Sequence, residues 1–209
     1  MPYISSDTLM REKLLEKVYG SLPPSPRLAF PIWARSQPKP IFTTFVKLAE
    51  AISKAPLVVL VDDVWTQIFT ERTDEEQLAI NRLYSEFFVG SGCKVKFSSS
   101  FLPPFLEILR EVGTGLSLEK IKHVLPREKR NDFSRQSYKE LTHVVIELSV
   151  LKQASEYADA IVMGSFSQGM ASLYRSVITN PLPVIITPTL KGEAHAREYC
   201  KQLEGLTLT

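Results

Sequence analysis

Two ionisable side chains with helical spacing are the first candidates for chemistry in this sequence. His143 and Glu147 lie four residues apart in the stretch HVVIELS, so a helix places both on one face. If that face lines a pocket, Glu147 can hold the ammonium group of a substrate or accept its proton before the amine attacks an ester. The alternative is a solvent-facing helical pair. We expect Glu147 and His143 to be catalytic.

Two adjacent acids follow a strongly apolar run. Asp62 and Asp63 come directly after LVVLV, where buried acids often acquire functional roles. Acids that face a pocket favour a cationic group in the substrate, such as an arginine side chain. The alternative is a helix cap after a strand. Trp65 and Tyr157 are candidate pocket aromatics, although such residues also pack in cores or at rims.

Small and polar residues follow two further apolar runs. Ser36 comes after LAFPIWA and is a nucleophile if a neighbour takes its proton or if an activated ester makes that unnecessary. Its alternative role is that of a turn residue. In the segment ADAIVMGSFSQGM we expect substrate contacts from Gly164, Ser165 and Gln168.

The stretch EKIKHVLPREKRNDFSRQSYKE concentrates basic side chains in a chain of net charge +2. Such a cluster is the electrostatic footprint expected for a phosphate backbone. The alternative is a solvated helical surface balanced by Glu119, Glu128 and Glu140. The basic residues expected to contact nucleic acid are Lys120, Lys122, Arg127, Lys129, Arg130, Arg135 and Lys139.

Strands and helices that alternate along the chain must position these residues, and this alternation predicts a parallel sheet covered on both faces. In a doubly wound sheet the ligand lies beyond the carboxyl ends of the strands, where strand order reverses. Ser36, Asp62, Ser98 to Ser100 and Gly164 all follow predicted strands. The sequence therefore predicts a Rossmann-like α/β domain with strands at 28–34, 57–61, 93–97, 159–163 and 183–187.

Capping signals set the expected helix bounds. Thr43 or Thr44 caps the helix VKLAEAISKA, and Thr73 to Glu76 form a capping box that opens a helix running to about Val89. Ser117 caps a short helix. The longest helix is expected at 134–157, and another at 7–20, before an irregular Pro-rich connection at 21–26.

Length and composition set broader limits. A chain of 209 residues with 44% hydrophobic content can bury one substantial core, so residues 1–209 are expected to form one domain, with 1–26 as its N-terminal helix and connection. Cys93 and Cys200 have neither disulfide nor metal-ligand spacing. We expect no metal site, and because the sequence has no signal-peptide pattern and no membrane span, a cytoplasmic protein.

The order of the segments from about Arg27 to about Leu190 resembles the catalytic domain of tyrosyl- and tryptophanyl-tRNA synthetases. LAFPIWA is similar to the first strand of that domain, VVLVDDVWTQIF to the second, and ADAIVMGSFSQGM to the segment with a Gly-Gly-x-x-Gln pattern. Residues 40–44 stand where those enzymes carry His-x-Gly-His, with neither His nor Gly. That helix start lacks the usual cradle for ATP phosphates. No Lys-Met-Ser-Lys-Ser loop follows ITPTLKG.

The chain is also similar to cyclodipeptide synthases, which resemble the same synthetases but take aminoacyl-tRNAs that are already charged. Glu147 and Leu148 match their Tyr-x-x-x-Glu-Leu-Pro pattern, whereas His143 and Ser149 replace the Tyr and the Pro. Ser36 is the nearest candidate for their nucleophile, without its Gly-x-Ser-Pro context. The departures from these patterns make the arginine-containing fungal branch a candidate group for this chain. The family resemblance implies an aminoacyltransferase that binds aminoacyl-tRNA through a basic helix and needs neither ATP nor another cofactor, with no DNA or membrane partner.

Two other functions remain open at this point. One is a catalytically silent synthetase relative that only binds tRNA or an amino acid. The other is an enzyme like the Asp/Glu racemases, because ADAIVMGSFSQGMASL is similar to a segment of that family. Those enzymes use two facing cysteines after strands, and neither Cys93 nor Cys200 is expected in such a turn. The sequence leaves the oligomeric state open.

Overall fold

Five parallel strands form the centre of the molecule. The computed structural model describes residues 22–23, 25–100, 111, 135–164 and 168–186. The strand order is β3-β2-β1-β4-β5, and every neighbouring pair is parallel. This is the doubly wound order, which reverses between β1 and β4, so the predicted fold class is confirmed. The strands are β1 (Leu28–Trp33), β2 (Val58–Asp62), β3 (Lys94–Phe97), β4 (Ala160–Met163) and β5 (Val184–Ile186).

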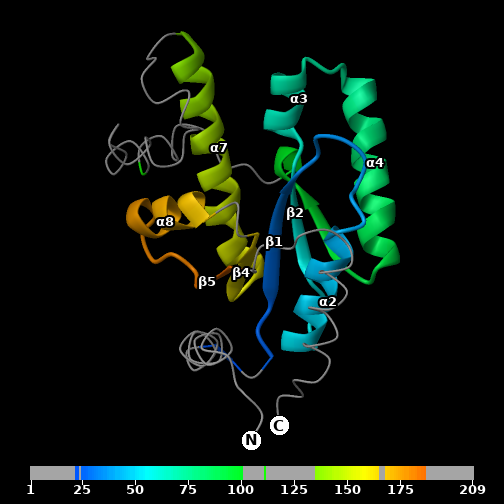
Figure 1. The fold of residues 1–209 in the computed structure, drawn as a ribbon, viewed down its shortest axis with the longest axis vertical. Helices are drawn as coiled ribbons and strands as arrows, with labels where there is room; N and C mark the ends of the chain where they lie inside the picture. Colours follow the sequence, from blue (N-terminus) through cyan, green and yellow to red (C-terminus); the bar gives the residue numbers. More distant parts are fainter. Residues whose placement is uncertain (1–21, 24, 101–110, 112–134, 165–167, 187–209) are drawn as a thin grey trace, which may run out of the picture.

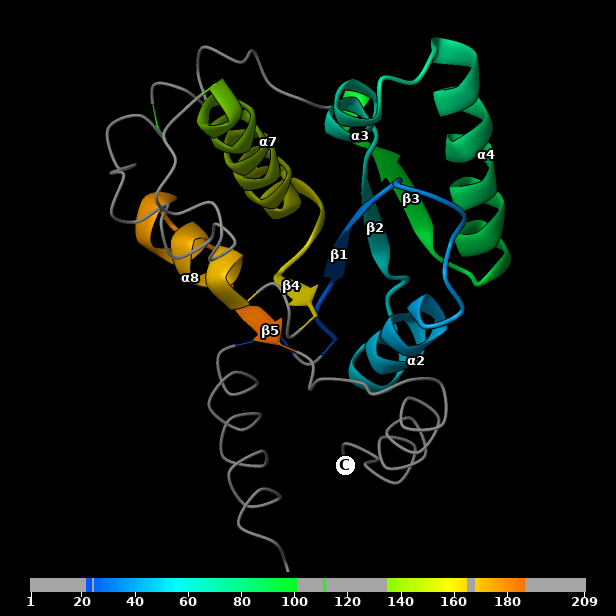
Figure 2. The same cartoon turned by 45° about the horizontal axis from the view of Figure 1, so that its top comes forward.

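Helices cover both faces of the sheet. Helices α7 and α8 lie on one face and α2 and α4 on the other, with α3 at the carboxyl edge of the strands (Figure 1). The turned view in Figure 2 shows the same separation. The bounds are α2 (Phe42–Ile52), α3 (Val64–Thr70), α4 (Asp74–Gly90), α7 (Arg135–Tyr157) and α8 (Gln168–Val177), with a short 3-10 helix at Ser98–Ser100.

The sheet separates two apolar cores. Successive side chains of a strand point to opposite faces. In β2, Val58 and Leu60 enter the core formed with α7 and α8, whereas Val59 and Val61 enter the core formed with α2 and α4. The same alternation places Asp62 on the α7 side of the sheet. We call the two clusters the α7-side core and the α4-side core.

Aromatic side chains dominate the α4-side core. The rings of Phe30 and Phe45 are stacked with centroids 4.2 Å apart. The ring centroid of Phe42 lies 5.9 Å from that of Phe88 and 6.4 Å from that of Tyr84. Burying such rings is among the largest apolar contributions that a side chain makes to folding. This core therefore stabilises β1 and β2 on the face of the sheet opposite to α7.

Local capping signals were partly confirmed. Thr73 and Glu76 form the predicted capping box, with the Thr73 backbone N–H donating to Glu76 at 2.9 Å and Glu76 N–H donating to Thr73 at 3.3 Å. The predicted cap at Thr43 or Thr44 is wrong. Helix α2 begins at Phe42 without a side-chain cap, because the Thr43 hydroxyl donates back to the carbonyl oxygen of Pro40 at 2.6 Å.

The other expected elements agree within a few residues or lie outside the described part. Each predicted strand has an observed counterpart, and the long helix spans Arg135–Tyr157. Cys93 directly precedes β3. The expected helices at 7–20 and after Ser117, and Cys200, lie outside the described residues. No helix among the described residues is long and apolar enough to cross a membrane.

Candidate active site

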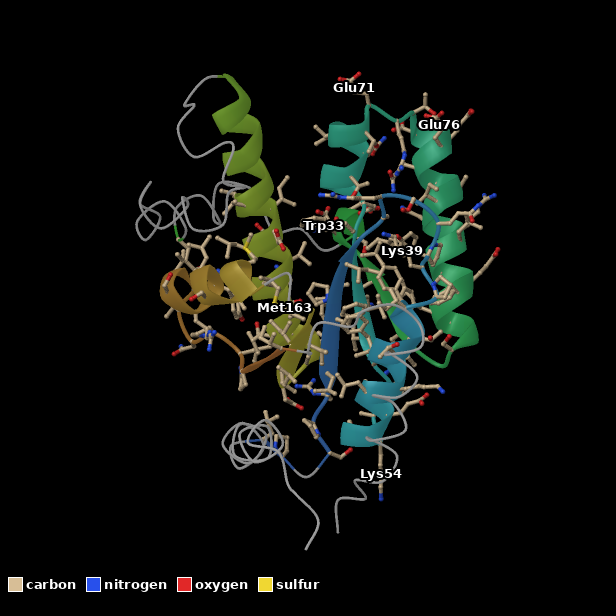
Figure 3. The ribbon with its side chains drawn as sticks, in the orientation of Figure 1. Trp33, Lys39, Lys54, Glu71, Glu76 and Met163 are labelled. Atoms are coloured by element: carbon tan, nitrogen blue, oxygen red, sulfur yellow. The ribbon has the colours of Figure 1, made fainter. Side chains whose placement is uncertain are left out.

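The candidate site lies at the carboxyl edge of the sheet, on the side covered by α7. Trp33 ends β1 and is paired in register with Asp62, which ends β2. Figure 3 shows Trp33 at the end of β1 that lies toward α3. Helix α7 packs against β1, β2 and β4, so it covers the point where strand order reverses. This is where ligands bind in doubly wound sheets.

Glu147 is buried on the sheet-facing side of α7. Only 9% of this residue is exposed, although it is ionisable. Burial, and after it the charge of Asp62, raise its pKa from 4.5 to about 8, and the charge of Arg35 opposes this rise. The solvent-facing alternative is therefore wrong for Glu147. The side chain of His143 lies outside the described part of the molecule, so its catalytic role stays a prediction.

Asp62 provides the second buried acid of the site. It is 1% exposed, and its Oδ1 lies 3.3 Å from the hydroxyl of Ser98, which follows β3. Asp62 belongs to β2 and Glu147 to α7, and the charge of Asp62 raises the pKa of Glu147. Two acids in one low-dielectric environment disfavour simultaneous ionisation.

Asp63 points to the other side of β2 and has chain partners on both oxygens. Oδ1 accepts from the Ser98 hydroxyl at 2.8 Å and from the Ser99 backbone N–H at 2.9 Å. Oδ2 accepts from the Ser99 hydroxyl at 2.6 Å and from Asn81 Nδ2 at 2.9 Å. Asp63 stands at the N-cap position of α3 but makes no side-chain cap bond, so the helix-cap alternative is wrong. The hydrogen bonds of Asp63 connect the ends of β2 and β3 to α4.

The exit from β1 contributes residues that the sequence analysis missed. The Arg35 guanidinium lies 4.2 Å from the ring centroid of Trp33, a distance at which a cation is attracted by the indole face. Arg35 also acts electrostatically on Glu147. Residues two apart at a strand end point to the same side, and this spacing is the signal that could have identified the pair. Ser36 follows and is exposed.

The remaining substrate-binding candidates come from other parts of the fold. Tyr157 ends α7, about 15 Å along the helix from Glu147, and the Lys96 Nζ lies 5.4 Å from the centre of its ring. Gly164 is buried directly after β4. Trp65 and Gln168 belong to α3 and α8, but their side chains, like all of Ser165, are not described. The substrate-binding roles of these residues stay predictions.

The basic residues of the predicted nucleic-acid surface are only partly placed. Arg135 and Lys139 lie in the first turns of α7, with side chains that are not described. Lys120, Lys122, Arg127, Lys129 and Arg130 lie outside the described residues. The contact of this surface with RNA therefore stays a prediction.

Among known proteins, solved structures show what this chain is similar to. No protein-family model and no curated protein matches the sequence. The tyrosyl-tRNA synthetase of Archaeoglobus fulgidus, complexed with L-tyrosine, is 16% identical with a TM-score of 0.65, over 87% of this chain and 60% of that one. A tryptophan-bound tryptophanyl-tRNA synthetase from Encephalitozoon cuniculi is 15% identical with a TM-score of 0.62, over 86% and 57%.

A CDPS, or cyclodipeptide synthase, from Fluoribacter dumoffii is 19% identical with a TM-score of 0.55, and the match covers 78% of this chain and 89% of that one. The chain thus spans about three-fifths of each synthetase but most of the CDPS. The expected resemblance to both groups is confirmed at the level of the fold.

Proposed function

We propose that this protein is a cyclodipeptide synthase that joins two amino acids delivered as aminoacyl-tRNAs. The observation that carries the proposal is the position of Glu147, a buried acid on α7, beside Asp62 and Arg35 at the carboxyl edge of the sheet. The shared fold with a CDPS and with tRNA synthetases is consistent with it. The cytoplasm, where charged tRNA is found, is the corresponding location.

Glu147 has the proton affinity that amine chemistry needs. An aminoacyl ester is attacked only by the neutral amine, and α-amino groups have pKa values of about 8. A carboxyl group whose pKa is also about 8 is matched to this proton, so its ionised form accepts the proton from the ammonium group and later returns it. The proton returns to the leaving oxygen as the amide bond forms and the ester bond breaks.

The complete reaction needs an acceptor for the first aminoacyl group, and Ser36 is our candidate. Its hydroxyl attacks the first ester, and the tRNA leaves with its hydroxyl restored. The amine of this seryl ester then attacks the second aminoacyl-tRNA, forming one amide bond and releasing the second tRNA. Attack of the new terminal amine on the seryl ester closes the ring and regenerates Ser36. Each amine attack releases one proton, which Glu147 accepts.

The acidic character of the site supports a cationic amino acid as one substrate. Asp62 and Glu147 are both buried on the α7 side, and a carboxylate there pairs well with a guanidinium group. We therefore propose that one of the two amino acids is arginine. Asp62→Asn keeps the size of the side chain and removes the charge, so the products should shift from arginine-containing to neutral cyclic dipeptides.

Purified protein supplied with charged tRNAs tests the proposal directly. Mass spectrometry should detect a cyclic dipeptide without ATP, and Glu147→Gln should lower its formation by about 10²-fold or more. The matched control is Glu86→Gln, the same chemical change at an exposed glutamate of α4. Binding of tRNA without any product from the wild-type protein would refute the proposal and favour a silent synthetase relative.

The racemase alternative gains no support from the described residues. Cys93 is buried just before β3, at the amino edge of the sheet and therefore opposite to Glu147 and Asp62. Burial also raises its pKa to about 11, which keeps the thiol protonated near neutral pH. Cys93 is poorly placed to act as the acid or base of a racemase at the carboxyl edge.

A further inference from the structure

Three consecutive backbone carbonyls at the exit of β1 accept hydrogen bonds from side chains of the neighbouring α3–α4 region. The Tyr84 hydroxyl donates to the carbonyl of Trp33 at 3.0 Å. Arg72 Nη1 donates to Ala34 at 2.9 Å, and Arg72 Nη2 donates to the carbonyl of Arg35. One guanidinium thus holds two successive peptide groups.

These bonds replace sheet bonds that the chain gives up as it leaves β1. The Ala34 N–H still donates to the carbonyl of Asp62 at 3.2 Å, but the Arg35 N–H donates back to the carbonyl of Trp33 at 2.9 Å. Beyond this turn the ladder cannot satisfy the carbonyls. Arg72 and Tyr84 supply the partners of these three carbonyls, so they hold the path of the loop that carries Arg35 and Ser36.

Arg72 is itself held in place by a chain of hydrogen bonds. Its Nη1 donates to Gln77 at 3.2 Å, and Gln77, which is buried, donates to Asn81 at 2.9 Å. Asn81 donates to Asp63, which also binds the serines after β3. The exits of β1, β2 and β3 are therefore connected through side chains of one helix and its preceding turn.

We infer that Arg72 is a positioning residue, which holds the β1 exit so that Arg35 lies over Trp33 and Ser36 is presented at the edge where Glu147 is buried. The inference rests on the proposed function for its catalytic consequence. It does not make Arg72 a substrate contact. A planar guanidinium can donate along two directions to two carbonyls, whereas a lysine ammonium on a flexible stem cannot reproduce this fork.

The first arm of the test measures loop geometry without any substrate. The chain has two tryptophans, so Trp65→Phe leaves Trp33 as the only indole. In this background Arg72→Lys and Arg72→Ala should change the intensity and the wavelength of Trp33 emission, because Arg35 moves off the ring. Arg82→Lys, at an exposed arginine of α4, is the matched control and should leave the emission unchanged.

The second arm measures turnover in the full-length protein, per folded molecule. Displacement of reacting groups by about 1 Å can lower the reaction rate by about 10²-fold. Arg72→Lys should therefore lower kcat by roughly 10- to 100-fold, with little change in the KM for aminoacyl-tRNA. Added guanidinium ion at millimolar concentration should partly restore both emission and turnover in Arg72→Ala. If the variants lost turnover only because they unfold, the loss would instead follow the fraction of unfolded protein measured by circular dichroism.

Wild-type Trp33 emission in both Arg72 variants would overturn the inference, as would wild-type kcat in Arg72→Lys despite altered emission. Absence of product from the wild-type protein is a different result. It would refute the proposed function before any variant is compared, and the emission arm would then decide the positioning of the loop by itself.

Discussion

The buried carboxyl of Glu147 should make the folded protein less stable as pH rises through the neutral range. Its pKa is about 8 in the folded protein and 4.5 as the ordinary value. Below pH 4.5 Glu147 is protonated in both the folded and the unfolded protein, so its ionisation does not change the free energy of unfolding. Between these values only the folded state holds the proton, so the free energy of unfolding falls with increasing pH. Above about pH 8 Glu147 is ionised in both the folded and the unfolded protein, and the free energy of unfolding is lowered by the full cost of burying its charge.

The size of this effect follows from proton linkage. One proton bound only by the folded state changes the free energy of unfolding by about 1.4 kcal/mol per pH unit. Glu147→Gln replaces the carboxyl with a neutral group of the same size and removes this dependence. The stability of the wild-type protein relative to Glu147→Gln should therefore fall by about 2 to 3 kcal/mol between pH 5.5 and 7.5.

Urea denaturation of both proteins at several pH values measures this difference. The comparison cancels the titration of those groups that do not interact with Glu147. Glu86→Gln, measured in the same way, should follow the wild-type curve. A difference between wild type and Glu147→Gln that stays constant with pH, or that grows in favour of the wild type as pH rises, would refute the reasoning about Glu147.

Two further predictions concern tRNA and ATP. Replacing Lys129, Arg130 and Arg135 with Ala should weaken tRNA binding and lower the log-log salt slope by about one unit for each phosphate group that the protein no longer neutralises, measured by filter binding at several salt concentrations; an unchanged slope would leave the cluster as a solvated surface. Because residues 40–44 contain neither His nor Gly, the protein should not catalyse amino-acid-dependent pyrophosphate exchange, and robust exchange with any amino acid would contradict this.

Features that depend on neighbouring residues could be predicted from the sequence. The capping box at Thr73 formed as expected, since its partner Glu76 is three residues away. The strands could be located from their apolar runs, and their ends led directly to Asp62. The cap expected at Thr43 failed because a competing local bond, to the carbonyl of Pro40, satisfies the hydroxyl one turn earlier.

Features that depend on distant partners could not be predicted in this way. Asp63 and Asp62 are adjacent and chemically identical, yet only Asp63 binds Asn81 and Ser99, which lie 18 and 36 residues further along the chain. The link from Arg72 to Ala34 spans 38 residues. Spacing alone carries no information about such contacts, because the turns and crossovers between them decide which side chains meet.

The division of the molecule into two cores has a consequence for changing its chemistry. Tyr84 of the α4-side core contacts the site end of β1 through its hydrogen bond to the carbonyl of Trp33, whereas Leu148 in the α7-side core lies next to Glu147 in the sequence. The sheet therefore separates the aromatic core from the face that carries the two buried acids, and hydrogen bonds at the strand ends connect the two sides. Substitutions on the α7 side can therefore change the surroundings of these two acids while the aromatic packing on the other face of the sheet is unchanged.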